Sequence, residues 1–573
     1  TNLSPNARTL LDVLAVANLP LPYKLLREFP GVESDQLLTT VEDLEARGLV
    51  IETSNELLDL AHNLLRETLL HSLSQLRRQD IHHQLARILE QCPALSQQFP
   101  ARQVALHAVA GEDSERARRY GLQILDELVR DNANAQTATF LRHLYDLLAP
   151  TAAPDELLRL TSALGRIHQS LGQLEEAASW HRQHLELADK LADLSARAAA
   201  HFELGELALV ANDYSAAAFA ARSGLALELP TEDSALIARG HRLMGAALAM
   251  EGSDLSSAER HLQEAVTAHR LTDSMSDLCA TLFELGNVAA QRGELRHALE
   301  LYQEAARTAE SAHVHYFLAL AYNNFAYHSL LLGRPEDARQ ALAKGKKLAE
   351  RYELFGALMH LYSTQGEIHL YLGEWQAASE AFHTSLTLAE ELRNLERQAG
   401  NRAGLALAER GKSNLEAALT LLEEALALIT EQGYWHLRTR IQLWLAETLF
   451  LSENFDLAET HLNAALATAR TQNRTLLLLH GERLNAYLLA ARGDWPGANI
   501  HFSQTFERAS KLQLPLEIAR TKVVWGQALL RYASPPHNGS TLLNEAQQTF
   551  ASHDARAELQ TISAGARVAD VPG

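Results

Sequence analysis

The sequence contains few cysteines and no long apolar run. Among its 573 residues are two cysteines, Cys92 and Cys279, which excludes a disulfide framework and a zinc site built from several cysteines. No stretch of about 18 apolar residues is present, so we predict no membrane span. The first residues lack the basic and apolar segments of a signal peptide. These absences predict a cytoplasmic protein, and the missing initiator Met is what we expect of a piece of a longer chain.

Motifs for catalysis are also missing. The phosphate-binding pattern Gly-x-x-x-x-Gly-Lys-Ser/Thr does not occur, since both Gly-Lys pairs, Gly345-Lys346 and Gly411-Lys412, lack its first glycine. Neither His-Glu-x-x-His nor Gly-x-Ser-x-Gly is found. The 26 histidines lack a companion constellation of carboxylates and cysteines. We therefore predict that this chain is not an enzyme and holds neither a metal nor a cofactor.

An excess of negative charge limits the partners. The chain has 71 acidic and 51 basic residues, a formal net charge of −20. Such a field repels the phosphates of a nucleic acid. We therefore predict no direct contact between this chain and DNA or RNA.

The strongest positive signal is an internal repeat, marked by a small residue in the middle of a predicted helix. Successive markers lie 38 to 42 residues apart: Gly165, Gly205, Gly245, Gly286, Ala326, Gly366, Gly404, Ala446, Ala486 and Gly526. A second small residue follows in most units, and larger residues such as Tyr302 lie between. Small residues let two antiparallel helices pack closely, and large ones fill the gap to the next hairpin. We predict an all-α fold, an α-solenoid superhelix of about ten helical hairpins of ~40 residues each.

The order of small and large residues resembles the tetratricopeptide repeat, whose period is about 34 residues. The longer period here resembles the sensor superhelix of bacterial signal-transduction ATPases with numerous domains (STAND), of the maltose-regulon activator type. The resemblance covers the chain from about Asp155 to its end. It implies a superhelix that binds an inducer or a protein, and a parent protein with an upstream ATPase domain that binds ATP or ADP.

The first 150 residues do not carry the repeat. Ser4-Pro5 predicts a helix start, helices are expected as far as Gly48, and two short strands follow around a turn at Ser54-Asn55. Three helices and a hairpin in this order predict a small winged-helix domain at residues 1–75. We assign residues 76–150 to a helical linker and residues 151–573 to the repeat superhelix.

The end of the predicted winged helix resembles the matching module of STAND proteins. In that family the module closes with Met-His-Asp at a helix start, and here the same place reads Ala61-His62-Asn63. The resemblance implies that His62 contacts the β-phosphate of ADP when an ATPase domain precedes this chain. One ring N–H at a fixed helix start suffices for that contact. The alternative is that His62 only packs where the strand meets the helix.

We expect a ligand site in the groove at the middle of the array. In tetratricopeptide stacks the first helix of each hairpin lines this groove, and the segment from His313 concentrates aromatic and amide groups there. Aromatic faces with amides and a carboxylate suit a sugar, a small polar metabolite or a short peptide. The predicted ligand-binding residues are Phe283, Asn287, Asn323, Tyr327, His360, Glu367 and Tyr371. The alternative is that the aromatic groups pack neighbouring hairpins.

Two functions remain open at this point. The leading hypothesis is the regulatory, ligand-sensing part of a STAND ATPase, acting in transcriptional regulation. The alternative is a free-standing tetratricopeptide scaffold that assembles proteins without a nucleotide switch. A phosphate-binding loop encoded upstream of Thr1 would favour the first hypothesis, and its absence the second.

Overall fold

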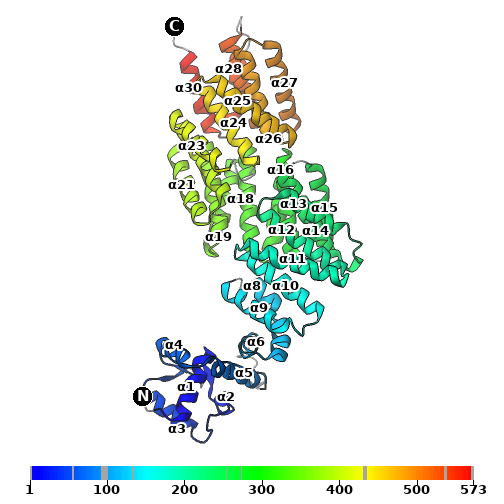
Figure 1. Ribbon diagram of the computed structural model, residues 1–573. Coiled ribbons are helices and arrows are strands. Elements are labelled where there is room, and N and C mark those ends of the chain that lie inside the picture. The colour runs from blue at the N-terminus through cyan, green and yellow to red at the C-terminus, as the bar shows by residue number, and fades with distance from the viewer. Residues whose placement is uncertain are drawn as a thin grey trace. The chain divides into compact units, whose positions relative to one another are not determined.

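A computed structural model describes residues 3–53, 57–91, 101–131, 134–252, 254–272, 274–429, 435–533 and 539–569. The chain divides into two compact units, Thr1–Leu207 and Ala208–Gly573. Helices follow one another along almost the whole chain (Figure 1). No helix of the described ranges combines the length and apolar composition that a membrane span needs.

The N-terminal unit begins with a small sheet packed against helices. Helix α1 (Pro5–Ala17) begins where Ser4 caps the backbone N–H of Ala7, as predicted. Helices α2 (Tyr23–Arg27) and α3 (Leu37–Ala46) follow, and β1 (Leu21–Pro22), β2 (Val50–Thr53) and β3 (Leu57–Leu60) form an antiparallel sheet of order β1-β3-β2. This small sheet is consistent with the predicted winged-helix start, and the winged-helix domain itself remains a prediction. The predicted turn at Ser54-Asn55 lies outside the described residues.

Further helices of different lengths connect this sheet to the repeats. They are α4 (Asn63–Ser72), α5 (Gln75–Gln91), α6 (Ala101–Ala110), α7 (Ser114–Arg116), the π-helical turn Ala117–Gly121, α8 (Leu125–Asp131) and α9 (Ala135–Leu148). Buried leucines of α8 and α9 share a core with the first repeat helix. The domain boundaries at residues 75 and 150 remain a prediction.

Ten helical hairpins follow in the described residues, at the predicted period. The first helices are α10 (Pro154–Ser170), α12 (Leu194–Val210), α14 (Ser234–Glu251), α16 (Met275–Gln291), α18 (His315–Leu331), α20 (Phe355–Tyr371), α22 (Leu395–Gly411), α24 (Trp435–Leu451), α26 (Thr475–Ala491) and α28 (Pro515–Tyr532). The second helices are α11 (Leu174–Leu191), α13 (Tyr214–Leu225), α15 (Leu255–Leu271), α17 (Leu295–Ser311), α19 (Pro335–Arg351), α21 (Trp375–Glu391), α23 (Leu415–Ile429), α25 (Phe455–Thr471), α27 (Trp495–Lys511) and α29 (Gly539–Ser552). Helix α30 (Arg556–Ala569) ends the array. The predicted fold class is therefore confirmed.

Several glycine markers make room for a large side chain. A Cβ built on Gly286 would lie 2.7 Å from the ring of Tyr302, which is fully buried. A Cβ on Gly366 would lie 2.7 Å from the ring of Phe382 in the same way. Because a real Cβ does not approach ring atoms so closely, glycine at these positions sets the distance between the two helices of a hairpin.

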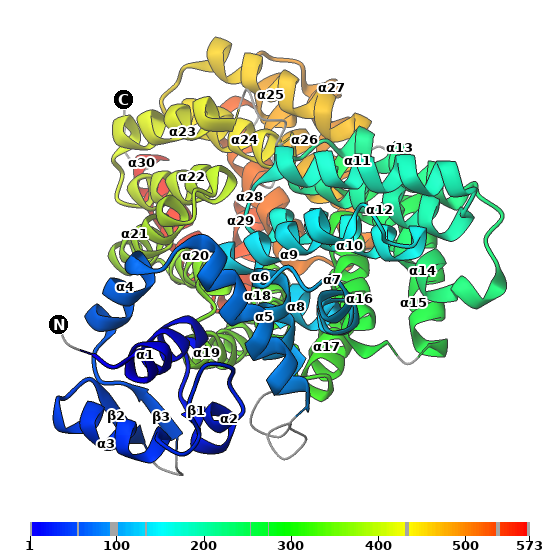
Figure 2. The same ribbon diagram turned by 60° about the horizontal axis from the view of Figure 1, so that its bottom comes forward.

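In the C-terminal unit the superhelix packs against itself. In Figure 2 the first helices α18, α20, α24 and α28 lie nearer the middle of this unit than the second helices α21, α23 and α25. Gly333 lies in a hairpin turn and has a φ of +74°. A Cβ built on this glycine would lie 2.4 Å from the ring of His553. The turn at Gly293 contacts Leu512 in the same manner. Contacts between residues about 220 positions apart mean that about five and a half repeats complete one superhelical turn.

Candidate functional site

The predicted ligand-binding residues all lie on first helices of the C-terminal unit. Phe283 and Asn287 belong to α16, Asn323 and Tyr327 to α18, and the other three residues, His360, Glu367 and Tyr371, to α20. These helices lie toward the middle of the unit in Figure 2. The structure separates them by their contacts. Asn287 and Asn323 belong to an amide ladder, and Tyr327 and Glu367 to a charged patch. Phe283 and Tyr371 make two separate packing contacts, and His360 lies near Arg397.

The amide ladder joins α16, α17, α18 and α20. The hydroxyl of Tyr302 and the amide of Asn324 both donate to Asn287 Oδ1, each over 2.8 Å. Asn323 donates to Asn324 Oδ1 over 3.1 Å and accepts from the hydroxyl of Thr364 over 2.8 Å. These amides use most of their hydrogen-bonding capacity within the protein. The ladder therefore fixes the spacing of four helices and leaves few groups for a ligand.

Phe283 and Tyr371 make packing contacts. The ring of Phe283 is buried and lies against Tyr302 and Phe317, with centroid distances of 5.9 and 6.1 Å. The hydroxyl of Tyr371 donates to the backbone carbonyl of His553 over 2.7 Å. Tyr371 thus connects successive superhelical turns, and burial raises the pKa of its hydroxyl.

The charged patch consists of Tyr327, Glu367, Arg397 and Arg440. The guanidinium of Arg440 lies 5.7 Å from the ring centroid of Tyr327 and 5.6 Å from that of Trp444, both within cation–π range. Burial raises the pKa of Glu367, an effect that the charges of Arg440 and Arg397 oppose. All four side chains of the patch are half-buried rather than sealed. The patch thus combines an aromatic face, a carboxylate and two guanidinium groups that are partly open to solvent.

His360 borders the charged patch. Burial, followed by the charge of Arg397, lowers the pKa of His360 to about 3. The imidazole is therefore neutral at pH 7 and offers a polar contact without a charge.

First helices closer to the C-terminus are joined by ion pairs. Glu447 Oε2 lies 2.7 Å from Arg410 Nη1, and Glu517 Oε2 lies 2.8 Å from Arg483 Nη1. The charges of Arg483 and Arg520 hold the pKa of Glu517 at about 2, although burial alone would raise it. These residues, like Arg397 and Arg440, were not among the predicted site residues. The repeat register could have identified two of them. Glu447 and Arg483 occupy the same positions relative to their markers as Tyr327 and Asn323.

His62 lies at the start of α4, at the predicted helix start. The residue immediately precedes the helix and its side chain caps no backbone group. The residue is exposed. Arg66, one turn further along, is instead held by the carbonyl of Leu14 and the carboxylate of Asp59.

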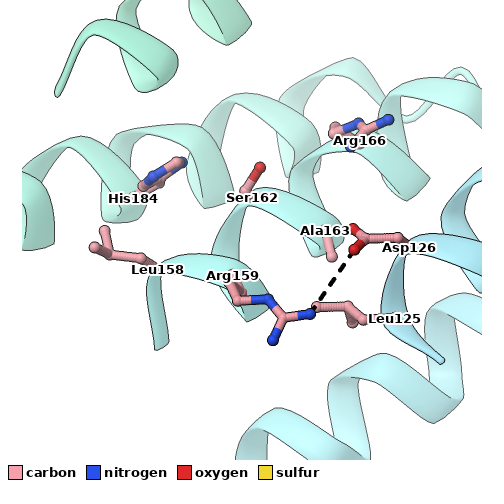
Figure 3. A pocket seen from close by; sticks show the side chains of 8 residues that line it. All are labelled: Leu125, Asp126, Leu158, Arg159, Ser162, Ala163, Arg166 and His184. Atoms are coloured by element: carbon pink, nitrogen blue, oxygen red, sulfur yellow. Dashed lines mark ion pairs between the residues drawn. The ribbon is translucent and has the colours of Figure 1, made fainter. Parts of the chain in front are cut away.

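The N-terminal unit contains a hollow of about 210 Å³ beside the first repeat. Figure 3 shows the side chains that line it, among them Ser162, Arg166 and His184, with Arg159 paired to Asp126 over 3.8 Å. The lining residue His184 donates to the buried carboxylate of Glu203 over 2.9 Å. Burial would raise the pKa of Glu203, but hydrogen bonds from His181 and His184 hold it well below its usual range.

Comparisons with known proteins agree with the repeat architecture. The tetratricopeptide repeat family matches residues 160–195, which include all of α11, and no curated protein matches. A Rap protein in complex with competence and sporulation factor is 14% identical, with 63% of this chain and 99% of that chain covered and a TM-score of 0.48. A STAND protein with a tetratricopeptide repeat sensor from Pyrococcus horikoshii is 15% identical, with a TM-score of 0.42. The match covers 83% of this chain and 66% of that chain. The chain is an α-solenoid of tetratricopeptide-like hairpins.

Proposed function

We propose that the array is a ligand sensor whose binding site is the charged patch on the inner side of the C-terminal unit. The observation that carries the proposal is the convergence of Tyr327, Glu367 and Arg440 from three different hairpins. A half-buried charge interacts more strongly with a polar group of a ligand than an exposed charge does, because the local dielectric constant is lower than that of water. The amide ladder beside the patch keeps it preorganised.

A short peptide or an exposed segment of a partner protein suits this patch best. Two guanidinium groups can bind a carboxylate, Glu367 can accept from an amine or a backbone N–H, and the ring of Tyr327 offers a stacking surface. A sugar or small polar metabolite would use the ring and Glu367 but would offer no carboxylate to the two guanidinium groups. The neighbouring cations also make an acidic group acceptable to a chain whose net charge is −20.

Binding at the patch would affect the contact between superhelical turns. Arg474 is buried, its Nη2 lies 3.4 Å from the carbonyl of Ala249, and its pKa is lowered to about 10 by burial and then by the charge of Arg440. A ligand carboxylate at Arg440 would reduce this repulsion and so stabilise the closed superhelix. Closure is therefore the change through which the sensor would report its ligand.

We further propose that the chain is part of a STAND-type regulator. His62 is exposed at a helix start, and in an ADP-bound parent protein it would donate to the β-phosphate. Replacing it by alanine (His62→Ala) in the parent should weaken ADP retention and raise basal activity. Unchanged ADP content together with unchanged basal activity would contradict the nucleotide role, and would favour a protein-assembly scaffold.

Peptide selection tests the sensor function. The full chain is used to select binders from a random library of short displayed peptides, and the affinity of the best binder is then measured by fluorescence anisotropy. Tyr327→Ala and Arg440→Ala should each bind at least about 10-fold more weakly, the loss of ~1.4 kcal/mol. The control is Arg270→Ala, because Arg270 is exposed and pairs with Glu304 over 2.5 Å on second helices. Equal affinity of all proteins, or enrichment of no peptide, contradicts the proposal.

A further inference from the structure

Two histidines and a glutamate meet on the hairpin formed by α14 and α15. His241 Nδ1 lies 2.8 Å from His261 Nδ1 and 2.8 Å from Glu264 Oε2. His261 Nδ1 lies 3.7 Å from the same carboxylate oxygen. The three ligand atoms thus lie within 4.8 Å of one another. This cluster belongs to neither the charged patch nor the amide ladder.

Helix geometry explains why the three groups meet. His261 and Glu264 are three positions apart on α15 and therefore point to the same face. His241 lies four positions before the marker Gly245 on the facing helix, and that glycine lets the two helices approach. The side chains of the histidines are about one-fifth exposed and that of Glu264 is 48% exposed, so the cluster is open to solvent.

We infer that His241, His261 and Glu264 form a binding site for a divalent transition-metal ion of the zinc class. Two imidazole nitrogens and one carboxylate oxygen are a common ligand set for such ions, and three protein ligands leave a position for water. Around a tetrahedral ion with bonds of about 2.0–2.1 Å, ligand atoms are about 3.3 Å apart. The observed separations of 2.8 to 3.7 Å need shifts of only a few tenths of an ångström.

The charges near the cluster permit a cation. Asp254 and Glu264 both act on His261 as negative charges, whereas Arg260 is the opposing positive charge. A neutral imidazole ring offers one lone pair to an ion. Without an ion, one Nδ1 would have to donate to the other. The experiment must distinguish that hydrogen bond from a metal site.

The hairpin formed by α26 and α27 provides a matched control. By alignment of the two hairpins, Glu482 and His501 occupy the places of His241 and His261, while Gln504 replaces Glu264. His501 Nδ1 lies 2.7 Å from Glu482 Oε2. This pair offers one imidazole and no third ligand, so it should not hold an ion.

Zinc binding to the untagged full chain tests the inference. The protein is stripped with a chelator and titrated with ZnCl2 by calorimetry, with melting temperature as a second readout. We expect saturable binding and a raised melting temperature, a loss of at least about 10-fold in affinity for His241→Ala and for Glu264→Gln, and no change for His501→Ala. Glu264 is largely exposed, so Glu264→Gln should fold normally. Absence of zinc binding, or equal binding by Glu264→Gln and the parent, overturns the inference.

Discussion

Replacing Gly286 by alanine should destabilise the array, although alanine normally favours a helix. In an exposed helix interior this change gains roughly 0.5–1 kcal/mol. Here the new Cβ would lie 2.7, 2.9 and 3.2 Å from atoms of the Tyr302 ring, which has no room to move because it is fully buried. Overpacking costs about 1–3 kcal/mol. A shifted ring would also lose its hydrogen bond to Asn287, worth about 1 kcal/mol. The net loss is then ~1–3 kcal/mol.

Gly400 supplies the control for this substitution. It also lies inside a helix, but a Cβ there would have its nearest neighbour, Leu437, at 4.0 Å. Gly400→Ala should therefore stabilise the protein by roughly 0.5–1 kcal/mol. Melting curves followed by circular dichroism compare both variants with the parent. A Gly286→Ala protein that melts at or above the parent temperature would refute the packing argument.

Two further predictions concern the turns and pH. Gly333→Ala should melt lower than Gly172→Ala, because both turns have a positive φ but only Gly333 meets a neighbour, the ring of His553; equal melting temperatures would argue against the contact between superhelical turns. Burial lowers the pKa of His107 to about 3, so the folded state resists protonation and stability should fall as the pH drops from about 6.5 toward 3. His107→Gln should flatten this dependence in pH-resolved melting curves, and an unchanged slope would contradict the assignment.

The repeat could be predicted from the sequence because its determinants are local. The spacing of small residues such as Gly286 and Gly366 records helix pairing within one hairpin, and the structure contains that pairing. The contact between Gly333 and His553 was not predictable. This contact depends on the small rotation between successive repeats, summed over several of them. No local sequence pattern specifies that rotation.

The candidate site was only partly predictable for a related reason. The groove positions identified Tyr327 and Glu367, but Arg397 and Arg440 stand six or seven positions before their markers, one helical turn outside the positions considered. Their approach to Tyr327 also depends on how several hairpins curve. His241 and His261 escaped notice because they are 20 residues apart on two helices and match no sequence motif.

Hydrogen exchange with and without a selected peptide tests the central claim most directly. If the ligand binds at the charged patch, backbone amides of the first helices α18, α20 and α24 should exchange more slowly in its presence. The second helices α19, α21 and α25 should change less. Protection confined to those second helices, or to the N-terminal unit, would contradict a sensor site on the inner side of the array.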